Sequence, residues 1–177
     1  MLNEYFFVTR WRVRGDLGEI KQILGDAEDL KRWWPSVYLD VKKRDDGVIE
    51  LFTKGWLPYT LRWSFRVTEQ RKDGFALDAF GDFVGHGDWK LVQDGEFTSI
   101  TYEWRIRAEK PLLRLLSPIL KPLFGANHRW AMERGEESLK IELDRRHGIA
   151  TSAPPKPTFW DGGAEGGVEK TGRAGGI

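Results

Sequence analysis

The chain has 177 residues, a formal net charge of +1 and no cysteine. This length suits one domain with an appendage. The balanced charge argues against an overall positive electrostatic field that would attract nucleic acid or an anionic membrane. Without cysteine there is no disulfide framework and no thiolate chemistry, and we expect a reducing, cytoplasmic location.

The N-terminal part predicts one strand followed by two short helices. The strand is predicted over residues 4–14. Over residues 9–14 the side chains of Thr9, Trp11 and Val13 alternate with arginines, which is the period of a strand with one wet face. Gly15 breaks this strand and Asp16 caps a helix over residues 17–24. A second helix runs over residues 26–34, before a proline. No basic start with an apolar block precedes these elements, so we expect no signal peptide.

The central part predicts a run of antiparallel strands. Tyr38 falls on the polar face of the first of them, opposite Val37 and Val41. Glycine-containing turns separate the strands and favour a meander with one dry face. The predicted strands cover residues 37–42, 48–55, 61–68, 75–81, 83–93 and 97–108.

Residues 124–143 predict a long helix with one apolar stripe. His128, Met132 and Gly135 fall within the same arc, about 80° wide, as the leucines of this segment. The span is about 30 Å long, enough to cross a whole sheet and cover its dry face. For His128 we favour a bond to the backbone over a polar ring offered to a ligand. For Gly135 we favour close helix–sheet packing over room for a ligand.

The segment 111–124 is apolar but contains three prolines, which predict short or kinked helix. One interpretation is a mouth element that touches a membrane transiently while a lipid is loaded. We favour the other, a connection packed on the sheet edge, because the prolines interrupt a continuous amphipathic face. Stable membrane insertion is not expected, since no apolar run approaches the roughly 20 residues that span a bilayer.

This order of elements, with the stretches WWPSVYLDV, GWLPYTLRWSFRVTE and NHRWAMERGEESLK, resembles the SRPBCC superfamily, the START-like or polyketide cyclase/dehydrase group. The resemblance covers residues 4–147. It implies an α+β helix-grip fold: a curved antiparallel sheet of about seven strands, two short helices after the first strand, and a long C-terminal helix across the concave face. It also implies a cavity between sheet and helix, but no catalytic set.

We expect residues 1–147 to form this domain and residues 148–177 to form a flexible tail. The tail is rich in glycine and proline and has few apolar residues to offset the entropy of ordering. The pair Phe159–Trp160 is the exception, and docking on the body or on a partner is as reasonable as an incidental pair.

Large aromatic side chains must line a core, a cavity or an interface, and the chain has nine tryptophans. Alternation alone favours a solid core, whereas the implied cavity makes a ligand wall an equal interpretation. The expected ligand-binding residues are Trp11, Trp34, Tyr59, Trp63, Trp89, Tyr102, Trp104, His128, Met132 and Gly135.

We therefore predict a protein that binds a hydrophobic or aromatic small molecule, a lipid or a polyketide-like compound. The alternative is a cyclase, dehydratase or hydrolase that uses the same cavity, with His128 as general acid/base and Tyr102 as hydrogen-bond donor. The three histidines lack metal-ligand spacing, so we expect no metal and no cofactor. We expect no nucleic-acid partner. A cavity of about 300–1,000 Å³ would support a small-molecule site.

Overall fold

The computed structural model describes residues 3–158, which form one antiparallel sheet, helices between its first two strands, and a long last helix. In chain order the elements are β1 (Glu4–Arg14), α1 (Leu17–Gly25), the 3₁₀ helix η1 (Ala27–Asp29), α2 (Leu30–Trp33), β2 (Tyr38–Lys43), β3 (Ile49–Lys54), β4 (Thr60–Arg71), β5 (Gly74–Gly81), β6 (Phe83–Asp94), β7 (Phe97–Ala108) and α3 (Pro111–Arg146).

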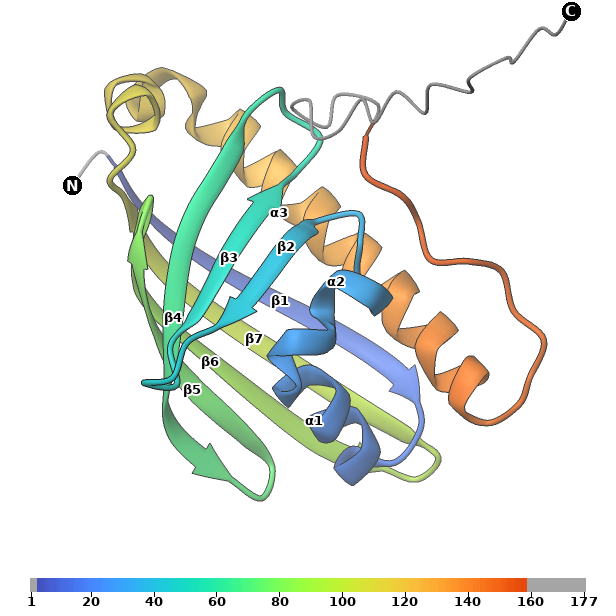
Figure 1. Ribbon diagram of the computed structural model, residues 1–177. Coiled ribbons are helices and arrows are strands. Elements are labelled where there is room, and N and C mark those ends of the chain that lie inside the picture. The colour runs from blue at the N-terminus through green and yellow to red at the C-terminus, as the bar shows by residue number, and fades with distance from the viewer. Residues whose placement is uncertain (1–2, 159–177) are drawn as a thin grey trace, which may run out of the picture.

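The seven strands lie in the order β1-β7-β6-β5-β4-β3-β2, so β2 to β7 form a meander and β1 pairs with the last strand. The sheet curves, and α3 lies along it in contact with β1, β7 and α2 (Figure 1). This confirms the predicted α+β helix-grip architecture. Within residues 3–158, no helix is apolar over a length that would span a bilayer.

The main difference from the predicted elements lies in α3. Residues 111–124 continue directly into the long helix, although Pro118 and Pro122 stand inside it. Each proline removes a backbone N–H and crowds the carbonyl four residues earlier, which bends a helix without always ending it. The first turns of α3 accordingly run in a different direction from the rest (Figure 1). Leu115 and Ile119 remain exposed on one side of this segment. On the other side Leu113 and Ser117 are buried, and the Ser117 hydroxyl accepts a hydrogen bond at 2.6 Å from Tyr5 of the edge strand β1, as expected for a segment packed on the sheet edge.

After Gly148, residues 149–158 contain no helix or strand. The division into a domain of residues 1–147 and a flexible tail of residues 148–177 stays a prediction. Phe159 and Trp160 lie outside the described residues.

Aromatic rings fill much of the concave face. On neighbouring strands, Trp89 stacks on Tyr102 with 4.0 Å between ring centroids, and Tyr102 lies 5.7 Å from Trp104. Trp63 extends this row at 5.6 Å from Trp104. Burial of such large side chains, each contributing about 1.5–3 kcal/mol, accounts for much of the core.

The helices α2 and α3 approach each other closely at Gly135. A Cβ atom at this position would lie 2.2 Å from Cζ2 of Trp34, the residue that follows α2. Glycine is therefore required for this packing. We expected a close approach between helix and sheet, and the structure instead shows one between α3 and the indole of Trp34.

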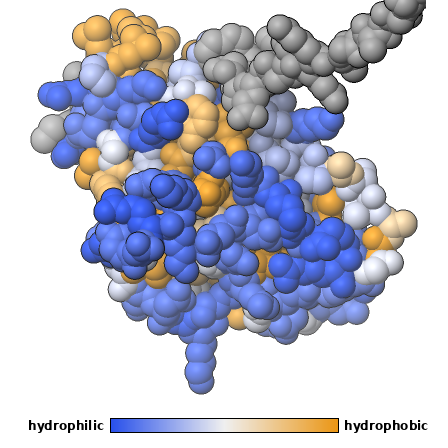
Figure 2. Space-filling view, viewed as in Figure 1, coloured by the Kyte–Doolittle hydropathy of each residue, from blue (hydrophilic) through white to orange (hydrophobic). Residues whose placement is uncertain are grey.

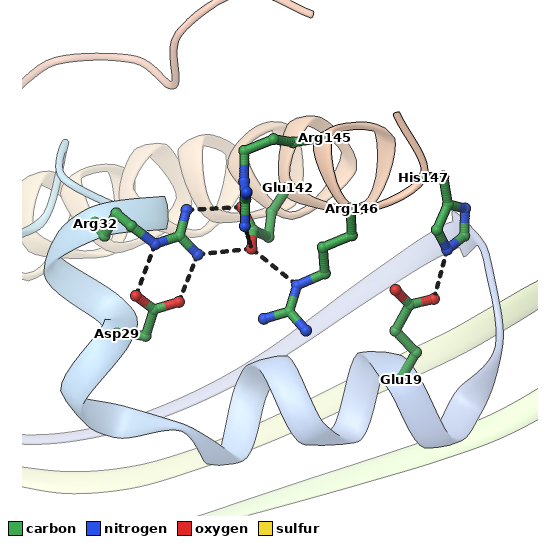
Figure 3. A network of polar contacts seen from close by, with 7 residues as sticks. All are labelled: Glu19, Asp29, Arg32, Glu142, Arg145, Arg146 and His147. Atoms are coloured by element: carbon green, nitrogen blue, oxygen red, sulfur yellow. Dashed lines mark hydrogen bonds and ion pairs between the residues drawn. The ribbon is translucent and has the colours of Figure 1, made fainter. Parts of the chain in front are cut away.

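A buried carboxylate fixes the same two helices further along (Figure 3). The side chain of Glu142 is 2% exposed and accepts hydrogen bonds from Arg32, Arg145 and Arg146 at 2.6–2.9 Å. Burial alone would raise the pKa of Glu142, but bonds from Arg145, Arg32 and Arg146 hold it well below its usual value. Arg32 also donates to Asp29, at 2.7 Å from Nε. Because Arg32 belongs to α2, this network joins α2 to α3.

Replacing Gly135 by alanine should destabilise the protein by about 1–3 kcal/mol, because the added Cβ overlaps the ring of Trp34. Gly125→Ala in the same helix is the matched control. Its Cβ would lie 3.9 Å from the nearest atom, Cε1 of Phe7, so it should stabilise the helix by up to about 1 kcal/mol. Urea unfolding of both variants measures the difference. Equal changes in the free energy of unfolding of the two variants would show that Trp34 and Gly135 do not pack tightly.

Candidate functional site

A cavity of about 120 Å³ lies between the concave face of the sheet, the residues that follow α2, and α3. Its walls are mainly apolar and aromatic, and they come from β1, β2, β3, β4, β6, β7 and α3 as well as the loop between β3 and β4. The sheet therefore does enclose an unfilled space. The volume is smaller than the 300–1,000 Å³ range of typical small-molecule sites.

Seven of the ten expected ligand-binding residues line this cavity. They are Trp34, Tyr59, Trp63, Tyr102, Trp104, His128 and Met132. Trp11, Trp89 and Gly135 are not among its lining residues. Trp11 and Trp89 are buried and pack against each other, with 5.6 Å between ring centroids. Strand alternation gives the face on which a residue lies but not how far along the sheet the cavity extends, so these tryptophans could not be separated from the others by sequence.

Several lining residues were not expected, and Tyr38 is the clearest case. It was placed on the polar face of its strand, but it lines the cavity and contacts Trp34 at 5.1 Å between ring centroids. The register between β2 and β3 shifts between Tyr38 and Asp40. A bulge of this kind turns the residues on its two sides relative to each other, which simple alternation does not predict.

The apolar walls carry polar atoms that have no hydrogen-bond partner. Within residues 3–158, the structure shows no hydrogen bond for the hydroxyls of Tyr38 and Tyr102. Burial raises the pKa of both side chains. Trp34 Nε1 and His128 Nε2 are also buried without a partner among these residues. Buried polar groups are normally satisfied, so the nitrogens of Trp34 and His128 have hydrogen-bonding capacity that residues 3–158 do not use.

His128 lies on α3 and stacks on Phe7, with 4.1 Å between ring centroids and an interplanar angle of 16°. Burial lowers the pKa of His128 from 6.5 to about 4. The imidazole is therefore neutral at pH 7, with one nitrogen that donates and one that accepts. The sequence favoured a hydrogen bond from His128 to the backbone over a polar ring at the cavity. In the structure His128 lines the cavity, and its Nε2 bonds to no backbone group of the described residues.

The loop between β3 and β4 closes one end of the cavity. Tyr59 packs edge-on against Phe124, with 6.0 Å between ring centroids. Asn127 of α3 accepts a hydrogen bond from the backbone N–H of Leu57 at 3.1 Å, and its amide lies 3.5 Å from the Tyr59 hydroxyl. Burial raises the pKa of Tyr59 to about 12. These contacts attach the loop to α3, so opening this end requires them to break.

Residues 3–158 bring together no group of three or more histidine, aspartate or glutamate side chains that could hold a metal ion.

Comparison with known proteins finds similar solved structures but no similar sequence. No family model matches the chain, and no curated protein matches its sequence. A conserved protein from Geobacillus kaustophilus superposes with a TM-score of 0.67 and 12% identity, over 80% of this chain and 96% of its own. The Zhui aromatase/cyclase from a Streptomyces species gives a TM-score of 0.63 and 16% identity, over 83% and 99%.

A third structure, the di-domain ARO/CYC StfQ from the steffimycin biosynthetic pathway, gives a TM-score of 0.57 and 14% identity. The match covers 84% of this chain and 53% of that one. At these identities the likeness concerns the fold alone. It confirms the predicted helix-grip fold.

The burial of neutral His128 predicts a loss of stability on mild acidification. Below pH 6.5 the unfolded chain protonates this histidine, whereas the folded chain resists protonation until about pH 4. The unfolded state then binds more protons, so stability falls as the pH drops through this window. Between pH 7 and pH 5 the loss should be about 2 kcal/mol in urea unfolding.

His128→Gln should remove most of this dependence, and His86→Gln, at an exposed histidine, should keep it. A His128→Gln variant with an unchanged pH profile would mean that the imidazole is not held neutral by burial.

Proposed function

We propose that the protein binds a compact hydrophobic or aromatic small molecule, lipid or polyketide-like in character, in the cavity between the sheet and α3. The observation that carries this proposal is an apolar, aromatic-walled space whose lining residues Trp34 and His128 each have a buried ring nitrogen without a partner among residues 3–158. Burial of apolar ligand surface would supply the affinity, and the polar atoms would orient a ligand oxygen. A cytoplasmic location belongs to the same proposal.

The size of the cavity restricts the ligand. An apolar cavity of roughly 150 Å³ accommodates benzene in a protein interior. The 120 Å³ present here therefore suits one aromatic ring or a short acyl segment. A larger polyketide-like or lipid ligand requires the loop between β3 and β4, or the first turns of α3, to move outward. The aromatase/cyclase names of two structures with the same fold support a ligand of polyketide-like character.

The alternative is a cyclase, dehydratase or hydrolase with His128 as general acid/base and Tyr102 as hydrogen-bond donor. Burial lowers the pKa of His128 to about 4 and raises that of Tyr102. At pH 7 both side chains are neutral. The neutral imidazole of His128 can accept a proton as a general base, but the protonated form that a general acid needs is scarce. The binding role needs no proton transfer, and we rank it first.

The first turns of α3 provide a surface that suits transient contact with a membrane. Figure 2 shows hydrophobic atoms gathered over this part of the molecule. Leu112, Leu115 and Ile119 are 55%, 76% and 78% exposed. From residue 110 to residue 132 the sequence has basic residues and no acidic one. Exposed apolar side chains with basic neighbours favour the surface of an anionic bilayer. We propose that the segment 111–124 contacts a membrane during ligand exchange.

Filling the cavity should abolish ligand binding. Ala131 of α3 lines the cavity, so Ala131→Leu should lower the affinity for fluorobenzene, a single neutral ring, by at least about tenfold. Ala126→Leu changes a residue of the same helix that is not among the lining residues, and it should leave binding within about twofold. Titrations followed by ¹⁹F NMR measure both affinities. Absence of saturable binding to the unmodified chain would contradict the proposed function.

Membrane contact is tested by sedimentation with vesicles of phosphatidylglycerol and phosphatidylcholine. The double variant Leu115→Glu/Ile119→Glu should bind these vesicles several-fold less than the unmodified chain, because it removes apolar area and adds negative charge. Val92→Glu, at another exposed apolar residue on β6, is the control and should change little. Equal loss in both variants, or no binding by the unmodified chain, would count against membrane contact.

A further inference from the structure

The strand β1 lies at one edge of the sheet, next to β7, and part of its backbone points away from the sheet. Before the strand begins, the carbonyl of Asn3 accepts a hydrogen bond from the N–H of Ala108 at 3.0 Å. After it ends, the N–H of Gly15 donates to the carbonyl of Glu96 at 3.0 Å. The unbroken register between β1 and β7 repeats this pairing at every second residue. Odd-numbered residues of β1 therefore bond to β7, and even-numbered residues direct their N–H and C=O groups outward.

A groove of about 210 Å³ follows this outer edge, between β1 and α3. At Arg12 the edge is covered, because its N–H donates to Oε1 of Glu136 on α3 at 3.4 Å. Val8 and Arg10 line the groove, and within residues 3–158 no group outside the sheet bonds to their backbone. Unpaired edge groups of this kind form a template for a further strand. The groove therefore offers the outward N–H and C=O groups of Val8 and Arg10 to a partner in extended conformation.

The wall of the groove that α3 provides carries one basic and one acidic side chain. Arg129 and Glu133 line the groove, and both are exposed. Residues four apart on a helix can form an ion pair with each other. Among the described residues, however, the structure shows no ion pair for either of these two. Both charges are thus available to a molecule that enters the groove.

Two contacts show where this wall lies along β1. His128 stacks on Phe7, with 4.1 Å between ring centroids. One turn or two further on, Glu136 accepts the bond from the backbone of Arg12. Thr9 lies between these contacts on β1 and also lines the groove. It is therefore opposite the part of α3 that lies midway between the basic and the acidic side chain of the wall.

We propose that the groove binds a second copy of this chain, with the two β1 strands antiparallel around a two-fold axis at Thr9. In this register Val8 of one copy faces Arg10 of the other, so two hydrogen-bonded pairs form and no two arginines are opposite each other. The same axis sets Arg129 of each copy against Glu133 of the other. A two-fold contact uses one surface twice, and this surface complements itself in both backbone groups and charge.

Other centres for the axis fit the charges less well. An axis at Arg10 or at Arg12 sets arginines of the two strands opposite each other, which is unfavourable. An axis at Val8 shifts the two helices and brings the Arg129 side chains of the two copies together. Thr9 is the centre that avoids both, and it leaves the bond between Arg12 and Glu136 outside the contact. This inference does not depend on a ligand in the cavity.

Sedimentation equilibrium of the full chain tests the pairing of charges. The contact is short, so we expect a dimer with a dissociation constant in the micromolar range. Arg129→Glu and Glu133→Arg should each weaken it by at least about tenfold, and the double variant should restore it to within about threefold. Glu137→Arg is the matched control, because Glu137 is an exposed residue of α3 that is not among the lining residues of the groove. It should change the dissociation constant by no more than about twofold.

Single cysteines test the register, since the chain has none of its own. On the axis the two Thr9 residues form a non-hydrogen-bonded pair with Cα atoms about 4.5 Å apart, which suits a disulfide. Thr9→Cys should therefore give a covalent dimer on mild oxidation, measured on a non-reducing gel. Val8→Cys is the control. Val8 is more exposed than Thr9 but faces Arg10 of the second copy, so this variant should cross-link at least about fivefold less.

Three results would overturn the proposal. A chain that stays monomeric up to about 1 mM would refute the second copy and leave the open edge to an extended segment of another protein. A dimer that neither charge reversal weakens would place the interface elsewhere on the molecule. Cross-linking by Val8→Cys without cross-linking by Thr9→Cys would refute the register. Each of these results leaves the binding of a ligand in the cavity unaffected.

Discussion

The contact between Trp34 and Gly135 is the constraint on which the cavity depends. A curved sheet and one helix leave an open side, and here the indole of Trp34 closes it by lying where a side chain of α3 would otherwise be. The bonds between Arg32 and buried Glu142 hold α2 against α3 and so keep Trp34 in place. Removing the free space at Gly135 would move a wall of the cavity, even though Gly135 does not line it.

The features that bear on function gather at one end of the molecule. The loop between β3 and β4 packs on α3 through Tyr59 and Asn127, and the first turns of α3 expose leucines beside it. Residues 149–158 return from the far end of α3, and the hydroxyl of Thr158 accepts a hydrogen bond from Lys54 Nζ at 2.5 Å. The other end is filled by packed rings such as Trp11 and Trp89.

Much of the fold could be predicted from local patterns. Alternation gave β1 and β7 with their observed bounds and placed Trp63, Tyr102 and Trp104 on the concave face. It failed at Tyr38, because a shift of register is a property of two paired strands and not of one. It also could not separate the tryptophans of the cavity from Trp89 in the packed core, since both share a period and a face.

By itself, the sequence determined the order of elements, the inward face of the strands other than the start of β2, and the apolar stripe of α3, because these follow from the spacing of apolar residues along one chain. Tertiary structure alone decided the volume left between sheet and helix, the partner of Gly135 and the burial of Lys54. Each of these depends on residues far apart in the chain: Trp34 lies about a hundred residues before Gly135, and Thr158 lies 104 residues after Lys54. Local periodicity carries no information on such distances, which are set only when residues 149–158, the strands and the helices pack together.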